Sequence, residues 1–263
     1  MRIITLLSDL GLRDGYAAQM KGVILATCPD ALVVDITHNI ERHNVAMGSF
    51  ILETTAPYFP ANTIHVAVVD PGVGSDRAAI VIECARALLI GPDNGLMARS
   101  SEKLRLESIY QIRDDEFQRK PMADTFHGRD IFAHTAALIA SGRKPKEVGP
   151  PMSNLKKLEL FSPILAGMNL RCQVLHVDIF GNIITNADKE LTRKIRENSL
   201  APVEIISRSG LLQARYVRSY YEVDPGGSAV LLGSQGFLEI AIREGSAADK
   251  LQVKPLEELE LRF

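Results

Sequence analysis

The first half of the chain alternates apolar, strand-like runs with segments of helical periodicity, and this alternation limits the folds open to it. The clearest apolar runs are residues 3–7, 32–36 and 63–69. Between them, residues 16–27 carry apolar side chains at helical spacing, and residues 45–55 form a second such segment. Strands that alternate with helices predict an α/β domain with a central, mostly parallel sheet covered by helices.

Local signals mark the ends of these elements. Pro29 closes the first helix, because proline disfavours helical backbone in the residue before it. Asn44 is a good N-cap for the second helix. Residues 79–83 and 88–90 predict two further strands, and residues 129–141 predict a helix.

The pattern changes after residue 142. Prolines and glycines interrupt residues 142–167, and beyond them short strands dominate, with one helical segment at 189–197. We therefore expect an α/β N-terminal domain (1–150), a linker (151–168) and a smaller, β-barrel-like C-terminal domain (169–263). The predicted C-terminal strands are residues 172–177, 203–206, 211–217, 229–232 and 237–242.

Composition excludes several classes of function. The net charge is −2 and the chain has no basic run, which disfavours nucleic acid as a partner. No apolar stretch has the length of a membrane span, so we expect a cytoplasmic protein. Cys28, Cys84 and Cys172 are scattered, which fits neither a disulfide framework nor a zinc site.

Polar loops follow the predicted strands or open a helix, and they carry the candidate catalytic residues. Asp9, Asp70 and Arg77 follow apolar runs, and His127 precedes a helix. In an open α/β sheet such loops gather at the carboxyl ends of the strands, where ligands bind. A carboxylate such as Asp9 can accept hydrogen bonds from a vicinal diol, and a histidine can exchange a proton near neutral pH. The alternatives are a turn-forming aspartate, a surface ion pair and a packed histidine.

Polar turns in the second half suggest a binding site. In the turn at residues 178–182, Phe180 could stack on a flat base while Asn182 reads its edge, although a plain hairpin turn is an equal alternative. Ser234 begins a second such turn. Asp14, read from its position alone, is a charge near a helix N-terminus.

Five of these motifs occur in the order found in one family. They are Ser8-Asp9-Leu10-Gly11, residues 69–74, Gly91-Pro92-Asp93-Asn94-Gly95, residues 126–132 and Asp178-Ile179-Phe180-Gly181-Asn182. Together they resemble the S-adenosyl-L-methionine hydroxide adenosyltransferases, which are related to the bacterial fluorinase and chlorinase. The resemblance implies an α/β domain, a linker and a β-barrel-like domain. It also implies a homotrimer that holds substrate between the first domain of one subunit and the second domain of its neighbour.

The resemblance further implies a reaction and a role for each candidate residue. Water attacks the 5′ carbon of S-adenosyl-L-methionine and gives adenosine and L-methionine, with no cofactor and no metal. Asp70, Arg77 and His127 are implied to hold the water, and Asp9 the ribose hydroxyls. The residues implied to hold the two ends of the substrate are Phe180 and Asn182 at adenine, and Asp178, Ser234 and Asp14 at methionine.

Departures from the halide-forming relatives bear on the reaction type. Those relatives carry a tyrosine where this chain has Asp70 and a serine where it has Gly128. An anionic Asp70 repels a halide but suits a polarised water, which favours hydrolysis. Gln235 replaces an arginine near the methionine carboxylate. His134 replaces an expected proline, and we expect it to lie away from the reacting atoms.

Three other functions stay open on sequence grounds. A metal-dependent hydrolase would use oxygen and nitrogen ligands from Asp9, Asp70, Asp93, Asn94 and His127. A non-catalytic protein would bind adenosine or S-adenosylmethionine without turnover. An S-adenosylmethionine-dependent halogenase would form a halogenated nucleoside.

Overall fold

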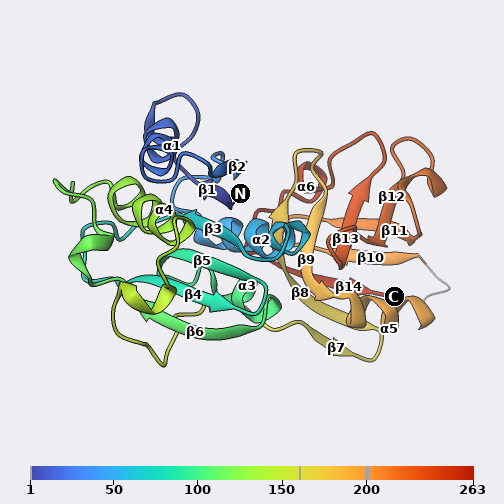
Figure 1. Ribbon diagram of the computed structural model, residues 1–263. Coiled ribbons are helices and arrows are strands. Elements are labelled where there is room, and N and C mark those ends of the chain that lie inside the picture. The colour runs from blue at the N-terminus through green and yellow to red at the C-terminus, as the bar shows by residue number, and fades with distance from the viewer. Residues whose placement is uncertain (1, 160, 199–201) are drawn as a thin grey trace. The chain divides into compact units, whose positions relative to one another are not determined.

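The computed structural model describes residues 2–159, 161–198 and 202–263. The chain divides into two compact units, one ending at Leu158 and the other beginning at Glu159 (Figure 1). The first is an α/β unit and the second is a β-barrel, so the predicted fold class is confirmed. No helix in the described ranges is long and apolar enough to cross a membrane.

The first unit is built on a mixed sheet with strand order β2-β1-β3-β5-β4-β6. The pairs β1–β2, β1–β3 and β3–β5 are parallel, as the alternating pattern predicted. Strand β4 is antiparallel to both neighbours, because two residues join it to β5 and a turn that short permits no crossover. The strands are β1 (Ile3–Ser8), β2 (Leu32–Thr37), β3 (Thr63–Val68), β4 (Ala79–Cys84), β5 (Ala87–Pro92) and β6 (Leu106–Gln111).

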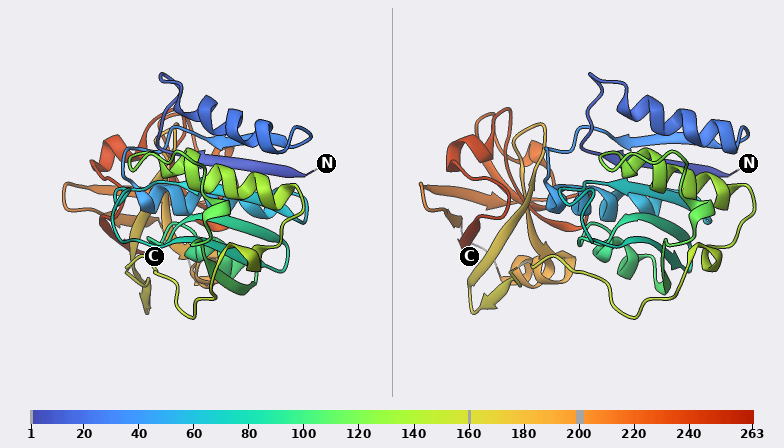
Figure 2. Two further views of the ribbon diagram at one scale, coloured as in Figure 1. Left: turned by 60° about the vertical axis from the view of Figure 1, so that its left-hand side comes forward. Right: turned by 90° about the vertical axis from the view of Figure 1, so that its left-hand side faces the viewer.

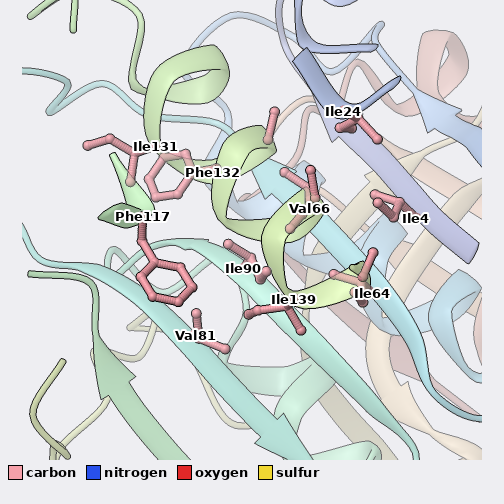
Figure 3. Packing of buried hydrophobic residues seen from close by; sticks show 14 of the residues in the cluster. Ile4, Ile24, Ile64, Val66, Val81, Ile90, Phe117, Ile131, Phe132 and Ile139 are labelled. Carbon is pink, nitrogen blue, oxygen red and sulfur yellow. The ribbon is translucent and has the colours of Figure 1, made fainter. Parts of the chain in front are cut away.

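Helices cover both faces of this sheet (Figure 2). On one face, α1 (Tyr16–Thr27) and α4 (His134–Ala140) enclose a buried cluster with the inward side chains of β1, β3, β4 and β5. Figure 3 shows part of this cluster, including Ile24, Phe132 and Ile139 against Ile64, Val66 and Ile90. On the other face, α2 (Val45–Thr55) completes a second cluster, together with Met97 and Leu104, the residues that flank α3 (Ala98–Lys103). Both faces of the central strands are therefore dry.

Two local predictions in this unit have clear outcomes. Asn44 caps α2, and its side chain accepts a 2.9 Å hydrogen bond from the backbone N–H of Met47, as predicted. The single helix expected over 129–141 is instead a π-helical turn, Gly128–Ala133, followed by α4. In that turn the buried Asp130 carboxylate accepts hydrogen bonds from Arg129 and from the backbone N–H of Ala123. Such turns are rare and often lie at functional sites.

The second unit is a closed barrel. Its strands follow one another in the order β8, β14, β10, β11, β12, β13 and β9, and β9 pairs with β8 to complete the ring. Closure leaves the ring without an unpaired edge. The strands are β7 (Ile164–Ala166), β8 (Asn169–Val177), β9 (Ile183–Asp188), β10 (Val203–Ile206), β11 (Leu211–Tyr216), β12 (Ser228–Leu232), β13 (Phe237–Ile242) and β14 (Glu258–Arg262), with helices α5 (Lys189–Asn198) and α6 (Ala247–Leu251).

The segment predicted as a linker contains ordered contacts. Pro151 forms a bridge with Tyr110 of β6, and the backbone N–H of Met152 donates to the carbonyl of Ile109 at 2.8 Å. Strand β7 pairs with β8 farther along. The predicted boundaries at 150 and 168 stay predictions.

Candidate functional site

Asp70, Arg77 and His127, which are far apart in sequence, form one hydrogen-bonded cluster in the first unit. Arg77 Nε donates to both carboxylate oxygens of Asp70 at 3.0 and 2.9 Å, and Arg77 Nη2 donates to Asp70 Oδ2 at 2.5 Å. The same Nη2 donates to His127 Nδ1 at 2.7 Å. The side chains of Arg77 and Asp70 are only 7% and 6% exposed. The guanidinium therefore joins a carboxylate to an imidazole in a largely dry environment.

A tight loop after β3 creates this arrangement. Asp70 comes two residues after β3 ends, and Arg77 comes two residues before β4 begins. Between them, the backbone N–H of Val73 donates to the carbonyl of Asp70, and Gly74 adopts a left-handed φ of 79°. A Cβ at Gly74 would also lie 3.1 Å from the carbonyl oxygen of Asp124. Glycine is favoured here by both the φ value and the close approach.

The hydrogen bond from Arg77 determines which nitrogen of His127 carries the proton. A guanidinium only donates, so Nδ1 must accept, and the ring proton of the neutral imidazole sits on Nε2. Burial, and then the charge of Arg77, lower the pKa of His127 below its ordinary value of 6.5, against the opposing effect of Asp70, Asp124 and Asp130. At neutral pH His127 is thus a neutral ring that offers an N–H donor.

This tautomer predicts an acid limb in the pH profile of any reaction that the cluster catalyses. Protonation of Nδ1 would place two donors face to face and break the link to Arg77. We expect kcat/KM to be flat above about pH 7 and to fall as the pH drops through a pKa below 6.5. Steady-state rates from pH 4.5 to 8 test this. A profile that rises toward acid would contradict the assignment, and the limb should move or vanish in a His127→Gln variant.

Asp9 lies in the loop after β1 and is half-buried. Its Oδ2 accepts a 2.9 Å hydrogen bond from the backbone N–H of His43, a residue with a left-handed φ of 64°. No described residue donates to Oδ1, so this oxygen has room for an outside donor. Asp14 is exposed and precedes Gly15, the N-cap of α1, which has no side-chain cap.

A cavity of about 720 Å³ in the second unit collects the remaining predicted residues. Asp178 organises the turn in its wall: its Oδ1 accepts from the backbone N–H groups of Phe180 and Asn182, and its Oδ2 accepts from Asn182 Nδ2, each at 2.9 Å. No described residue donates to Asn182 Oδ1. Phe180 is 75% exposed, and Ser234 and Gln235 also line the cavity.

Sequence reasoning missed Tyr220 and Glu239 in the wall of this cavity. The Tyr220 hydroxyl donates to Glu239 Oε1, and Glu239 is only 7% exposed. Burial, reinforced by the nearby Asp178, raises the pKa of Glu239, while the Tyr220 hydrogen bond lowers it. The available signal was a single acid inside the apolar run of β13. Its partner, Tyr220, could not be predicted, because it lies in the segment between β11 and β12, where no local pattern points to β13.

Two of the side chains proposed for a metal-dependent alternative, Asp93 and Asn94, bond to backbone groups. Asp93 Oδ1 accepts from the backbone N–H of Lys156 at 2.9 Å, and Asn94 Nδ2 donates to the carbonyl of Val69 at 2.8 Å. Within residues 2–159, 161–198 and 202–263, no group of three or more His, Cys, Asp or Glu side chains is arranged to hold a metal ion. His134 Nε2 contacts the carbonyl of Glu116 and takes no part in the Asp70–Arg77–His127 cluster.

Two family models match consecutive parts of the chain. The SAM hydroxide adenosyltransferase N-terminal domain matches residues 4–149, and the SAM hydroxide adenosyltransferase C-terminal domain matches residues 172–260. The chain therefore belongs to the SAM hydroxide adenosyltransferase family, and the resemblance predicted from the five motifs is confirmed.

Individual relatives span nearly the whole chain. An (R)-S-adenosyl-L-methionine hydrolase from Methanocaldococcus jannaschii is 38% identical, over 99% of this chain and 96% of the relative. A fluorinase from Nocardia brasiliensis is 26% identical, over 96% of this chain and 94% of the relative. The crystal structure of an uncharacterized conserved protein from Thermotoga maritima has a TM-score of 0.94 at 34% identity, covering 99% of this chain and all of that one. The chain is closer to this hydrolase than to this fluorinase.

Proposed function

We propose that this protein hydrolyses S-adenosyl-L-methionine to adenosine and L-methionine by attack of water at the 5′ carbon. The observation that carries the proposal is the buried Asp70–Arg77–His127 cluster in a chain of the SAM hydroxide adenosyltransferase family. The activity for which the Methanocaldococcus jannaschii relative is named supports the same reaction.

In the proposed mechanism, Asp70 accepts the proton and His127 orients the water. His127 Nδ1 is engaged by Arg77, so His127 offers only its Nε2–H, which donates to the water oxygen. Asp70 Oδ2 accepts two hydrogen bonds from Arg77, whereas Oδ1 accepts one and keeps a lone pair that can accept from the water O–H. The new C–O bond forms as the C5′–S bond breaks, and the sulfur leaves as a neutral thioether that needs no acid.

Positioning supplies most of the rate enhancement in this scheme. Holding water in line with the C5′–S bond is worth roughly 7–11 kcal/mol. Proton transfer to a positioned base adds about 10²- to 10⁴-fold, or roughly 3–5 kcal/mol. Arg77 contributes by fixing both partners of the water, and its guanidinium also lies over the Phe132 ring at 5.2 Å. A rigid cluster therefore matters more than a strong base.

The charges of the barrel cavity suit a cationic substrate. S-adenosylmethionine carries a sulfonium and an ammonium against one carboxylate, and the cavity wall includes three acids, Asp178, Glu239 and Glu244, against one basic residue, Arg243. We assign adenine to Phe180 and Asn182, whose unengaged Oδ1 can accept from an exocyclic amine. Asp178, Ser234 and Asp14 are assigned to the methionine end, and Asp9 to the ribose hydroxyls.

The function is tested with the two epimers of S-adenosyl-L-methionine at sulfur, supplied separately in ¹⁸O-labelled water. We expect equal amounts of adenosine and methionine, with ¹⁸O in the 5′-hydroxyl of adenosine. The name of the Methanocaldococcus jannaschii relative leads us to expect faster turnover of the R epimer. Unlabelled adenosine, or binding without any product, would refute the hydrolytic mechanism.

Two further experiments test the metal-dependent hydrolase and the halogenase alternatives. Activity that survives exhaustive chelation removes the metal-dependent hydrolase, and fluoride or chloride should give no halogenated nucleoside. We also propose that the protein needs no cofactor and forms a homotrimer. Light scattering on a size-exclusion column tests the oligomeric state. A cytoplasmic location stays a prediction.

A further inference from the structure

A second hydrogen-bonded chain of side chains lies at the end of β1, outside the Asp70–Arg77–His127 cluster. Ser8 Oγ lies 2.7 Å from His38 Nδ1, and His38 Nε2 lies 3.1 Å from Asp35 Oδ1. Lys21 Nζ then donates to Asp35 Oδ2 at 2.6 Å. This series of hydrogen bonds runs from Lys21 on α1, which is partly exposed, to Ser8, which is fully buried.

The directions of these hydrogen bonds follow from their partners. The Asp35 carboxylate only accepts, so His38 Nε2 carries a proton, and in the neutral ring Nδ1 accepts from the Ser8 hydroxyl. Ser8 Oγ in turn accepts from the backbone N–H of Leu10 at 3.3 Å. A serine, a histidine and an aspartate in this order suggest a nucleophile, but Ser8 has no exposed surface and its oxygen faces the backbone. The hydrogen-bonded series from Lys21 to Ser8 therefore suits the positioning of neighbouring groups and does not suit nucleophilic attack.

The same elements hold the loop that carries Asp9. The backbone N–H of Gly11 donates to the carbonyl of His38 at 2.7 Å, and that of Ile40 donates to the carbonyl of Ser8 at 3.3 Å. Gly11 has a left-handed φ of 68°, which permits the turn. Asp9 thus sits between two points, Ser8 and Gly11, that are both fixed to His38.

We propose that His38 is a positioning residue that sets the Asp9 carboxylate for the ribose diol of the substrate, acting through the hydroxyl of Ser8. This inference rests on the proposed function, because it takes the ribose as the ligand of Asp9. Asp35 and Lys21 orient the imidazole from the outside, and the loss of either end of the chain loosens the Asp9 loop.

Strand β1 supplies a matched control. Thr5 Oγ1 of β1 lies 2.7 Å from His65 Nδ1 of β3, and the two form a buried hydroxyl–imidazole pair of the same chemistry. This pair lies in the middle of the strand, away from the Asp9 loop. Thr5→Val removes its hydroxyl with little change of shape, just as Ser8→Ala removes the hydroxyl of the proposed chain.

The experiment measures Kd values for adenosine and 2′-deoxyadenosine by calorimetry on the full-length protein. The readout is the preference for the ribose, which a general loss of stability would not change. We expect a clear preference in the wild type, and its loss in Asp9→Asn. Ser8→Ala should reduce it roughly 2- to 10-fold, the worth of one lost hydrogen bond. Asp35→Ala, at a more exposed position, should act in the same direction even if Ser8→Ala fails to fold.

Each outcome decides the proposal. A reduced preference in Ser8→Ala or Asp35→Ala, with Thr5→Val like the wild type, supports it. An unchanged preference in Ser8→Ala and Asp35→Ala, or an equal reduction in Thr5→Val, overturns it. A wild type that hydrolyses S-adenosylmethionine without preferring the ribose removes the role of Asp9 and leaves the proposed function standing. A wild type that neither binds adenosine nor forms it removes the proposed function itself.

Discussion

Replacing Asp70 by asparagine is expected to lower kcat by roughly 10²- to 10⁴-fold, the range for loss of a positioned base. Asparagine keeps the size of the side chain but gives up the charge that would receive the proton of the water. Substrate contacts elsewhere are untouched, so the Kd for S-adenosylhomocysteine should change less than about threefold. Single-turnover rates and calorimetric titration measure the two quantities separately. Equal losses in both would contradict the catalytic assignment.

His127→Gln is the comparison that separates a base from an orienting group. A glutamine side chain has an oxygen that can accept from Arg77 Nη2 and an amide N–H that can donate to water. If His127 only orients, this variant should keep far more activity than Asp70→Asn. If His127 is the base, the two variants should be equally slow, and the role given to Asp70 would be wrong.

Much of the Asp70–Arg77–His127 cluster could be predicted from the sequence, because local sequence patterns mark the strand ends that carry its residues. An apolar run that ends in a polar, glycine-containing loop predicts a strand end, and parallel strand ends share one edge of a sheet. That reasoning predicted that Asp9, Asp70, Arg77 and His127 come together. The structure joins Asp70 and His127 through the guanidinium of Arg77, whereas no hydrogen bond among the described residues links Asp9 to them. The direction of the hydrogen bond to Nδ1 was not predictable, since side-chain geometry decides it.

The barrel was harder to predict because its pairings are non-local. Strand β9 contains Thr185 and Asn186, whose polar side chains hide the strand pattern in sequence. In the structure the Thr185 hydroxyl donates to the carbonyl of Leu238, and Asn186 Oδ1 accepts from the backbone N–H of Gln173. Leu238 lies on β13, which is distant from β9 in sequence, so the first of these partners is non-local, whereas Gln173 lies on the preceding strand β8. Tyr220 lies between β11 and β12 and Glu239 lies on β13, and no local sequence pattern predicts their contact.

Arg77→Met should be the most destabilising single change near the cluster. Asp70 is buried and Arg77 is its cationic partner, so the variant leaves a carboxylate without compensation. Removing one partner of a buried pair costs about 3–5 kcal/mol in the free energy of unfolding. Urea-induced unfolding of the full chain measures this loss of free energy, and calorimetric melting of a separate sample checks it.

The double variant Asp70→Asn/Arg77→Met distinguishes an unpaired charge from lost packing. With the carboxylate replaced by an amide, the methionine no longer faces a buried anion, so the double variant should unfold with a higher free energy than Arg77→Met alone. Because Asp70 and Arg77 are in contact, their effects should depart from additivity by more than about 1 kcal/mol. Additive losses would mean that the guanidinium acts through its packing on Phe132, and that the ion pair contributes little to the stability of the fold.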